Sequence, residues 1–437
     1  MSNNENTPQS KDFYRNVINE SLFPFWNKAV DRKNGGIFTC FDNSGGKLLS
    51  KDKYTWSQGR FLWMWSRYIE NIRSGNISEP EPGALLDLEE DSRRTAQFLL
   101  EKSFMDNGHV IFLLSETGEP KIINDGAPPD ASIYADCFIC LGFSEYARVF
   151  KEERFARRAL ELYRNIASRV EKGEYYTEPY PVPPGCTMMG IPMFTMYTGS
   201  DLAQSLYALG QSEAAEAAAI AEKNAAILEK DFFIKPFNVE LKGPASLDGT
   251  LLARHMTPGH IVECLWFYIH FKEFLKQTKI LGSREDTDFR LALADTLGRW
   301  AMDHSWDEEK GGIFRFIDHD GGEPRGALID DPYEKLILKT WDTKLWWVHS
   351  ESLYFSALMA GRLGEAGDKM ADNAAYWRKI NRKIFDYTFS TFPNPDSSIG
   401  EWIQIRSRDA SPLNEVVALP VKDPYHIFRN MLLLLEL

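Results

Sequence analysis

The chain has 437 residues, of which 43% are hydrophobic and 26% charged, an ordinary balance for a globular protein that excludes a disordered or fibrous chain. Its 50 Lys and Arg against 63 Asp and Glu give a formal net charge of −13, and no basic stretch is dense enough to follow a phosphate backbone, so no nucleic acid partner is expected. No apolar run approaches the ~18 residues of a membrane span, and the polar N-terminus lacks an apolar signal core, so we expect a cytoplasmic protein that makes no membrane contact.

The pattern along the chain is predominantly helical. Apolar residues recur at helical spacing between loops that contain Gly, Pro, Asn and Asp, which predicts an all-α protein. The strongest predicted helices cover residues 60–71, 91–102, 136–149, 156–170, 201–228, 258–278, 286–304, 349–363 and 369–388, with a final helix after Pro424. Two β-prone runs bounded by glycine, 35–41 and 311–317, interrupt this pattern.

These two runs belong to an internal repeat. Asn34-Gly-Gly-Ile-Phe-Thr-Cys-Phe-Asp42 matches Lys310-Gly-Gly-Ile-Phe-Arg-Phe-Ile-Asp318, and an aromatic-rich helix start follows each copy. The copies lie 276 residues apart (311 minus 35), about four helical hairpins at ~60–70 residues each. A ring of six hairpins would therefore use residues 13–437 as a single (α/α)6-barrel catalytic domain with short β-hairpins in its loops, after a polar tail of residues 1–12. The alternative is two unrelated helical domains that share a turn motif.

His260 is the most informative histidine. Pro258 and Gly259 mark a helix start, which places His260 in the first turn and Glu263 on the same face one turn later. A carboxylate beside an imidazole fixes its tautomer and raises its basicity, as a general base requires. A capping histidine with a surface carboxylate is the alternative interpretation.

Another helix start combines aromatic and polar residues. Trp346 and Trp347 precede His349 and Glu351, and paired tryptophans beside polar groups suit the apolar face and hydroxyl rim of a sugar. Core positions for the two tryptophans are the alternative.

Two further groups stand at helix starts. His426 follows a proline and shares a helix face with Arg429, and Arg60 offers a fixed fork of donors for an oxyanion or a vicinal diol. Three histidines therefore occupy similar positions in different helices.

Other motifs are given structural interpretations. Cys137 and Cys140 have the spacing of a redox pair, but both lie on one face of an apolar helix, so buried core thiols are predicted. His260 and Glu263 could both ligate a metal, but no second pair of this kind completes a site, and we predict no required metal.

Together these motifs resemble the N-acylglucosamine 2-epimerase family, which includes renin-binding protein, cellobiose 2-epimerases and the sulfoquinovose and mannose isomerases. The resemblance spans nearly the whole chain and rests on Gly35-Gly-Ile-Phe-Thr-Cys40, Trp56-Ser-Gln-Gly-Arg60, Pro258-Gly-His260-Ile-Val-Glu263, Lys344-Leu-Trp-Trp-Val-His349-Ser-Glu351, Gly400-Glu401-Trp402 and His426. It implies an (α/α)6 barrel and a sugar 2-epimerase or aldose–ketose isomerase that requires no cofactor. A nucleotide effector and a homodimer stay open at this point.

The resemblance also implies roles for individual residues. The sugar ring opens, and His260 and His426 then exchange the C2 proton on opposite faces through an enediolate, while Arg60 contacts the carbonyl side and Glu263 is the supporting carboxylate. The free reducing sugar would be of the N-acylglucosamine, N-acylmannosamine or mannose type. The expected substrate-binding residues are Tyr54, Trp56, Tyr197, Trp346, Trp347, His349, Glu351 and Trp402.

Two departures from the family pattern bear on substrate choice. Tyr197 stands where cellobiose 2-epimerases and sulfoquinovose isomerases have a histidine proposed to help ring opening, and residues 419–425 replace a Lys/Gly-rich stretch of the N-acylglucosamine epimerases. N-acyl specificity is therefore not implied. The main alternative is a glycoside hydrolase on the same barrel, in which two carboxylates flank the scissile bond, with candidates Asp136, Glu263, Asp342 and Glu351. That alternative leaves the paired histidines without a role. A non-catalytic interaction module is a third interpretation.

Overall fold

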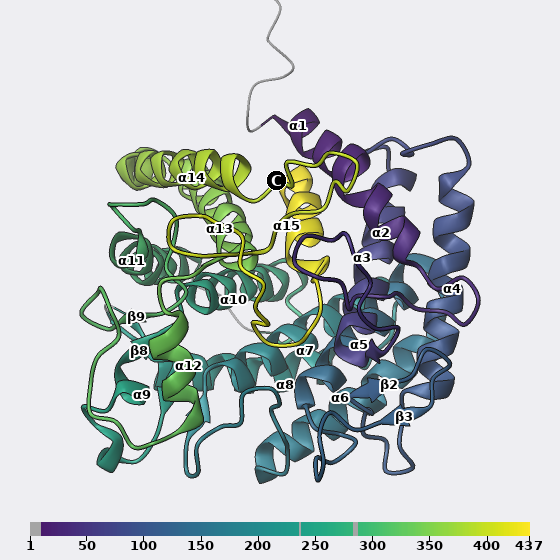
Figure 1. The fold of residues 1–437 in the computed structure, drawn as a ribbon, viewed down its shortest axis with the longest axis horizontal. Helices are drawn as coiled ribbons and strands as arrows, with labels where there is room; N and C mark the ends of the chain where they lie inside the picture. Colours follow the sequence, from purple (N-terminus) through teal and green to yellow (C-terminus); the bar gives the residue numbers. More distant parts are fainter. Residues whose placement is uncertain (1–9, 236, 283–286) are drawn as a thin grey trace, which may run out of the picture.

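The computed structural model describes residues 10–235, 237–282 and 287–437 (Figure 1). The helices in chain order are α1 Lys11–Asn16, α2 Phe23–Ala29, α3 Thr55–Arg73, α4 Ala84–Lys102, α5 Ile133–Phe150, α6 Glu153–Lys172, α7 Gly190–Ala208, α8 Ala214–Ile227, α9 Leu251–Arg254, α10 Pro258–Thr278, α11 Thr287–Ser305, α12 Pro332–Thr340, α13 Trp346–Glu365, α14 Ala371–Thr391 and α15 Tyr425–Glu436. Among these described residues, none of the helices combines the length and apolarity needed to cross a bilayer.

Short strands lie in the loops between the helices. They are β1 Lys53–Tyr54, β2 Leu113–Leu114, β3 Pro120–Lys121, β4 Thr187–Met188, β5 Phe233–Ile234, β6 Phe237–Asn238, β7 Leu241–Lys242, β8 His255–Met256, β9 Ile317–Asp318, β10 Lys344–Leu345 and β11 Ile405–Arg406. They form small antiparallel pairings: β1 with β2 and β2 with β3, β4 with β7, β5 with β6, β8 with β9, and β10 with β11.

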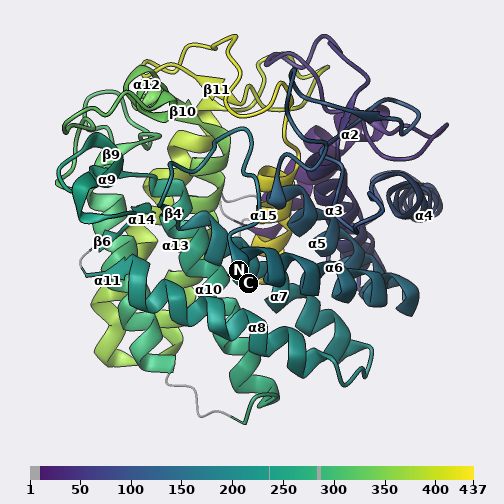
Figure 2. The same ribbon diagram turned by 90° about the horizontal axis from the view of Figure 1, so that it is seen from below.

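The helices form two concentric layers (Figure 2). In the described part of the chain the inner ring consists of α3, α5, α7, α10, α13 and α15, each packed on the next, and α15 closes the ring against α3. The outer helices α4, α6, α8, α11 and α14 pack on α3, α5, α7, α10 and α13, and the N-terminal α1 packs on α15 (Figure 1). The (α/α)6 barrel predicted from the repeat is confirmed, and the two ends of the chain together supply its sixth hairpin.

The two layers differ in their sequence pattern because they differ in burial. The inner helices α5 and α10 are buried almost all around and read as nearly continuous apolar segments, whereas α6 exposes one face and alternates with helical period. The inner ring also needs close backbone contact. A Cβ on Gly59 of α3 would lie 2.3 Å from the Phe138 carbonyl oxygen of α5, so only glycine allows this approach.

The predicted helix boundaries hold best where capping signals are clear. The predicted helix 258–278 coincides with α10, which begins at Pro258. The prediction of one helix over 201–228 is wrong, because α7 ends at Ala208 and α8 begins at Ala214, with Gly210 at φ +71° between them. Residue 286, the predicted start of the next helix, lies outside the described residues, as do residues 1–9 of the predicted polar tail. Helix α1 begins at Lys11, where the Ser10 side chain accepts a hydrogen bond from the Phe13 N–H.

Both copies of the internal repeat contain a buried lysine that ties the glycine turn to the following helix. Lys53 donates to Asp31 Oδ2 and to the Gly35 carbonyl oxygen, both at 2.7 Å. Lys344 lies 3.2 Å from Asp307 Oδ2 and 3.4 Å from the Gly312 carbonyl oxygen. The repeat therefore marks equivalent places on the barrel, at the entrances to α3 and α13.

The second shared contact lies five residues after each lysine. The Ile37 N–H donates to Gln58 Oε1 at 2.8 Å, and the Ile313 N–H donates to His349 Nε2 at 2.9 Å. Gln58 and His349 thus occupy equivalent positions and do the same structural work for their glycine turns.

Removing the buried lysine should destabilise the fold. Lys53→Met leaves the Asp31 carboxylate buried without its partner, so the free energy of unfolding should fall by ~3–5 kcal/mol in urea titrations. The matched control is Lys51→Met, because Lys51 is 56% exposed and its ion pair with Glu116 should contribute less than ~1 kcal/mol. Equal losses in the two variants would contradict the prediction.

Candidate active site

A cavity opens at the end of the barrel where the inner helices begin. About 160 Å³ is available to the centres of water-sized molecules. Residues from the first two turns of the inner helices line it, including Trp56 and Arg60 of α3, Phe138 of α5 and Phe194 of α7. Much of the wall is aromatic, from Trp56, Tyr134, Phe138, Tyr180, Phe194, Phe316, Tyr333, Trp346 and Trp347. Such a wall suits the apolar faces of a sugar.

His260 stands in the first turn of α10 and lines the cavity. Its Nδ1 lies 2.8 Å from Glu240 Oε1, and Glu240 is held by the pairing of β7 with β4, where its carbonyl oxygen accepts from the Met189 N–H. Burial lowers the pKa of His260, but the charge of Glu240 prevails and raises it overall. Because a carboxylate accepts the Nδ1 proton, Nε2 keeps its lone pair and can act as a base.

The expectation that Glu263 supports His260 directly is wrong. Glu263 does line the cavity, but its Oε1 accepts from Arg429 Nη2 at 3.0 Å and lies 3.8 Å from His426 Nδ1. The shared helix face brings Glu263 near His260 without a bond between them, because the guanidinium of α15 draws the carboxylate away. Glu240, twenty residues before His260, forms the bond to the His260 imidazole instead.

His426 stands in the first turn of α15 with a carboxylate on Nδ1. Glu351 Oε1 lies 2.7 Å from this nitrogen and also accepts from Arg429 and from Asn430, while Glu351 Oε2 accepts from Trp266 Nε1 at 2.8 Å. Burial opposes ionisation of Glu351, but Arg429 and His426 lower its pKa. Glu351 is therefore a partner of His426, and the expectation that it lines the substrate cavity is wrong.

Trp347 connects the two histidines. Its ring centroid lies 5.2 Å from that of His260 and 5.7 Å from that of His426, and all three side chains line the cavity. Trp347 follows Lys344 by three residues, as Trp56 follows Lys53, so each copy of the repeat supplies one tryptophan to the cavity wall. Trp346 also lines the cavity.

Arg60 faces the same space from α3. Its Nη1 lies 3.3 Å from Asp423 Oδ1, and its guanidinium packs over Phe138 at 4.0 Å and Trp56 at 4.7 Å. Asp423 Oδ2 lies 3.5 Å from His426 Nε2, so this carboxylate stands between Arg60 and His426. Gln404 fixes the Asp423 backbone through bonds of 2.9 and 3.0 Å.

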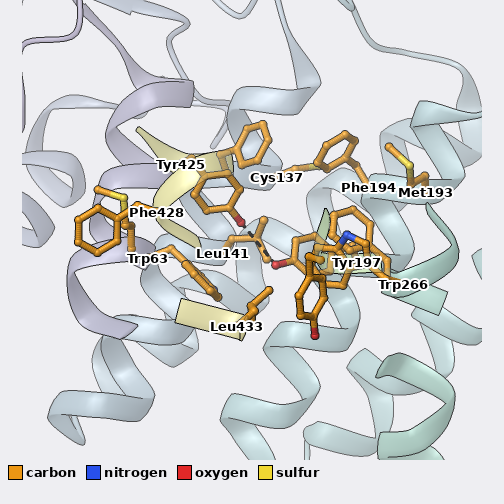
Figure 3. Packing of buried hydrophobic residues seen from close by; sticks show 14 of the residues in the cluster. Trp63, Cys137, Leu141, Met193, Phe194, Tyr197, Trp266, Tyr425, Phe428 and Leu433 are labelled. Carbon is orange, nitrogen blue, oxygen red and sulfur yellow. Dashed lines mark hydrogen bonds between the residues drawn. The ribbon is translucent and has the colours of Figure 1, made fainter. Parts of the chain in front are cut away.

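Three aromatic residues expected to bind substrate lie outside the cavity wall, and those expectations are wrong. Tyr54 packs on Phe112 beside β1. Tyr197 stacks on Phe267 with centroids 3.6 Å apart, and its hydroxyl faces that of Tyr425 at 3.4 Å in the buried core (Figure 3). Trp402 is buried against Phe389 and Phe392. These three aromatic side chains therefore pack in the hydrophobic core of the barrel.

The expectation for His349 is also wrong. Its Nδ1–H donates to the Leu345 carbonyl oxygen at 2.7 Å, and its Nε2 accepts from the Ile313 N–H. Burial lowers its pKa to about 3, so the ring is neutral and both nitrogens are occupied. The side chain is buried in the repeat turn, away from the cavity.

Sequence reasoning missed several residues of the cavity wall. Glu240, Arg315, Tyr180 and Tyr333 come from loops and from α12, where no periodic pattern singles them out. Asp423 stands in the last motif, three residues before His426, and that helix-start spacing was the one available signal.

The predicted core thiols are buried, and one cluster of candidate metal ligands lies beside the cavity. Cys137 and Cys140 are buried, as predicted, and burial raises the pKa of Cys137 to about 12. Donor atoms of Glu263, Glu351 and His426 lie within 4.8 Å of one another, but Arg429 Nη2 already bonds both carboxylates. A guanidinium therefore occupies the position where a cation would bind.

His349→Gln should leave kcat/KM near the wild-type value. The amide oxygen of glutamine can accept from the Ile313 N–H, as Gln58 does for Ile37 in the other copy. His349→Leu removes the acceptor and should lower the free energy of unfolding by ~1–3 kcal/mol without changing KM. A raised KM in a stable His349→Gln variant would instead favour a role in sugar binding.

Comparisons with known proteins first define the class by fold. A cellobiose 2-epimerase from Bacillus thermoamylovorans B4167 superposes with a TM-score of 0.73 at 17% identity, and a D-mannose isomerase with 0.69 at 15%, each over 98% of both chains. The N-acylglucosamine 2-epimerase of Bos taurus is 26% identical over 415 residues, 94% of this chain and 87% of that protein. The profile of the N-acylglucosamine 2-epimerase (GlcNAc 2-epimerase) family matches residues 193–430. The chain therefore belongs to the N-acylglucosamine 2-epimerase family.

Proposed function

We propose that the protein is a sugar 2-epimerase or aldose–ketose isomerase that moves a proton at C2 of a free reducing sugar. One observation carries the proposal: His260 and His426 line a single cavity on either side of Trp347, and each has its Nδ1 bonded to a buried carboxylate. This arrangement leaves both Nε2 atoms for proton exchange. The relatives named above act in the same class, on N-acylglucosamine, cellobiose or mannose according to their names.

The proposed reaction starts from the open-chain aldose. His260 Nε2 takes the C2 proton, the C–H electron pair forms a C1–C2 double bond and the carbonyl π pair moves to the oxygen to give an enediolate, while Glu240 stabilises the imidazolium. Arg60 and the helix N-termini around the cavity stabilise the negative oxygen. Proton return to C2 from His426 on the opposite face gives the epimer, whereas proton delivery to C1, with the O2 proton transferred to O1, gives the ketose. Only protons move, so we propose no cofactor.

The glycoside hydrolase alternative fits the carboxylates poorly. Of its four candidates only Glu263 lines the cavity, and that side chain is bonded to Arg429. Asp136 is buried against Arg169, and Glu351 is bonded to His426. A hydrolase needs one carboxylic acid and one carboxylate on either side of the scissile bond, and these positions do not supply such a pair.

Replacing either histidine should abolish most proton exchange. We expect His260→Asn and His426→Asn each to lower the rate of C2 exchange in D2O by ~10²–10⁴-fold, measured by NMR with N-acetylmannosamine, mannose, fructose and cellobiose. His304→Gln is the matched control, because His304 is exposed and bonds the Trp300 carbonyl oxygen on the outer layer. Near-normal exchange in either variant, or glycoside cleavage without exchange, would contradict the proposal.

The pH profile should report the Glu240–His260 pair. Because Glu240 raises the His260 pKa, the neutral base is lost as pH falls through that raised value, which sets the acidic limb of kcat/KM. Glu240→Gln removes the raising charge while burial persists, so the acidic limb should move to lower pH with a lower maximal rate. Glu263→Gln is the comparison variant and should move the limb less, since Glu263 acts on His260 only through space. A larger shift in Glu263→Gln would restore the sequence-based assignment.

A further inference from the structure

Arg315 is a cavity residue that the proposed proton transfer does not use. It follows the second glycine turn, and the equivalent residue of the first turn is Thr39. Arg315 is 4% exposed, and it lines the cavity with Phe316, over which its guanidinium packs at 4.8 Å. Burial of a guanidinium is costly unless something compensates its charge.

The bonds of Arg315 fix its position without neutralising it. Nη1 donates to Thr340 Oγ1 at 3.0 Å, and Nη2 donates to the Tyr180 hydroxyl at 3.1 Å. Both hydroxyls donate their own protons elsewhere, Thr340 to the Leu336 carbonyl oxygen and Tyr180 to the Val417 carbonyl oxygen. They can therefore only accept from Arg315, and they hold the fork of N–H donors in place.

The acidic side chains of the cavity wall already have partners. Glu240 is bonded to His260, Asp423 to Arg60, and Glu263 to Arg429. Across residues 10–235, 237–282 and 287–437, no acidic side chain lies within 4.0 Å of the Arg315 guanidinium, whereas Arg60, the other arginine of the wall, has Asp423. One fixed cation of the cavity is thus left for a ligand.

We propose that Arg315 binds an oxyanion carried by the substrate, such as a carboxylate or phosphate group, so that the preferred sugar is acidic. A guanidinium fork matches both groups in geometry and charge. This inference rests on the proposed function for the identity of the ligand as a sugar.

Equilibrium binding tests the subsite independently of turnover. Calorimetric titration with D-glucuronate, D-mannose 6-phosphate and their neutral parents glucose and mannose should show roughly 10- to 100-fold tighter binding of at least one acidic sugar to the wild-type protein, the range expected for a charge-assisted contact. The two acidic probes distinguish a carboxylate from a phosphate subsite. Equal binding of acidic and neutral sugars by the wild-type protein would overturn the inference.

Variants assign that preference to Arg315. Arg315→Gln should lose it while still binding neutral sugars, and Arg325→Gln, a surface arginine 58% exposed, should retain it. If Arg315→Gln fails to fold, Arg315→Lys is used in its place. This variant keeps a cation but not the fork of N–H donors, so it should lose part of the preference for the acidic sugar. Tyr180→Phe removes one acceptor that orients the guanidinium and should also weaken it. Retention of the full preference in Arg315→Gln or in Arg315→Lys would overturn the inference.

Turnover separates this inference from the proposed function. In the D2O exchange assay, Arg315→Gln should raise KM for the acidic sugar while leaving kcat, and the kinetics of the neutral sugar, close to wild type. Exchange that is equal for acidic and neutral sugars in the wild-type protein would overturn the acidic-sugar preference alone. Absence of exchange with every sugar would overturn the proposed function, and the binding titrations would still decide the role of Arg315.

Discussion

The parallel orientation of the inner helices is the constraint on which the site depends. Each of the inner helices α3, α5, α7, α10 and α13 is followed by an outer helix that returns the chain, and α1 packs on α15, so all six inner N-termini meet at one end of the barrel. The first two turns of these helices supply Arg60, Phe138, Phe194, His260 and His426 to one cavity. The aligned dipoles of these helices favour negative charge there, where the proposed enediolate would develop. The parallel packing of the inner helices therefore sets both the position of the cavity and its preference for negative charge.

Two carboxylates complete this arrangement, and they reach it by different routes. Glu240 comes from the loop just before β7 and bonds His260, whereas Glu351 comes from α13 and bonds His426. Glu351 is buried with Arg429, which also binds Glu263 of α10, so one ionic cluster joins α10, α13 and α15. A buried cluster of this kind is stable only when every member is bonded. The cluster that orients His426 thus also holds three inner helices together.

The repeat and the capping signals made the barrel predictable, since a fixed spacing and Pro258 carry information within the sequence itself. The partners of the site were less accessible. Spacing of three residues puts Glu263 on the face of His260, but it cannot show that Arg429, far along the chain, binds that carboxylate. The internal repeat, in contrast, does indicate the role of His349. Gln58 occupies the equivalent position in the first copy, and an amide cannot transfer protons, so the function that the two positions share is a structural hydrogen bond. Loop residues such as Glu240 follow no period.

Chemistry and selectivity occupy different parts of the molecule. The histidines, Arg60 and Trp347 project from helix starts fixed by the inner ring, while Tyr180, Phe316, Tyr333 and Leu419 reach the cavity from connections and from α12. Loops tolerate change because few barrel contacts depend on them, whereas a shift of a helix start would move an imidazole relative to C2. Under the proposed mechanism, a change of loop residues can therefore alter the preferred sugar while the inner ring, which sets the proton-transfer geometry, is left untouched.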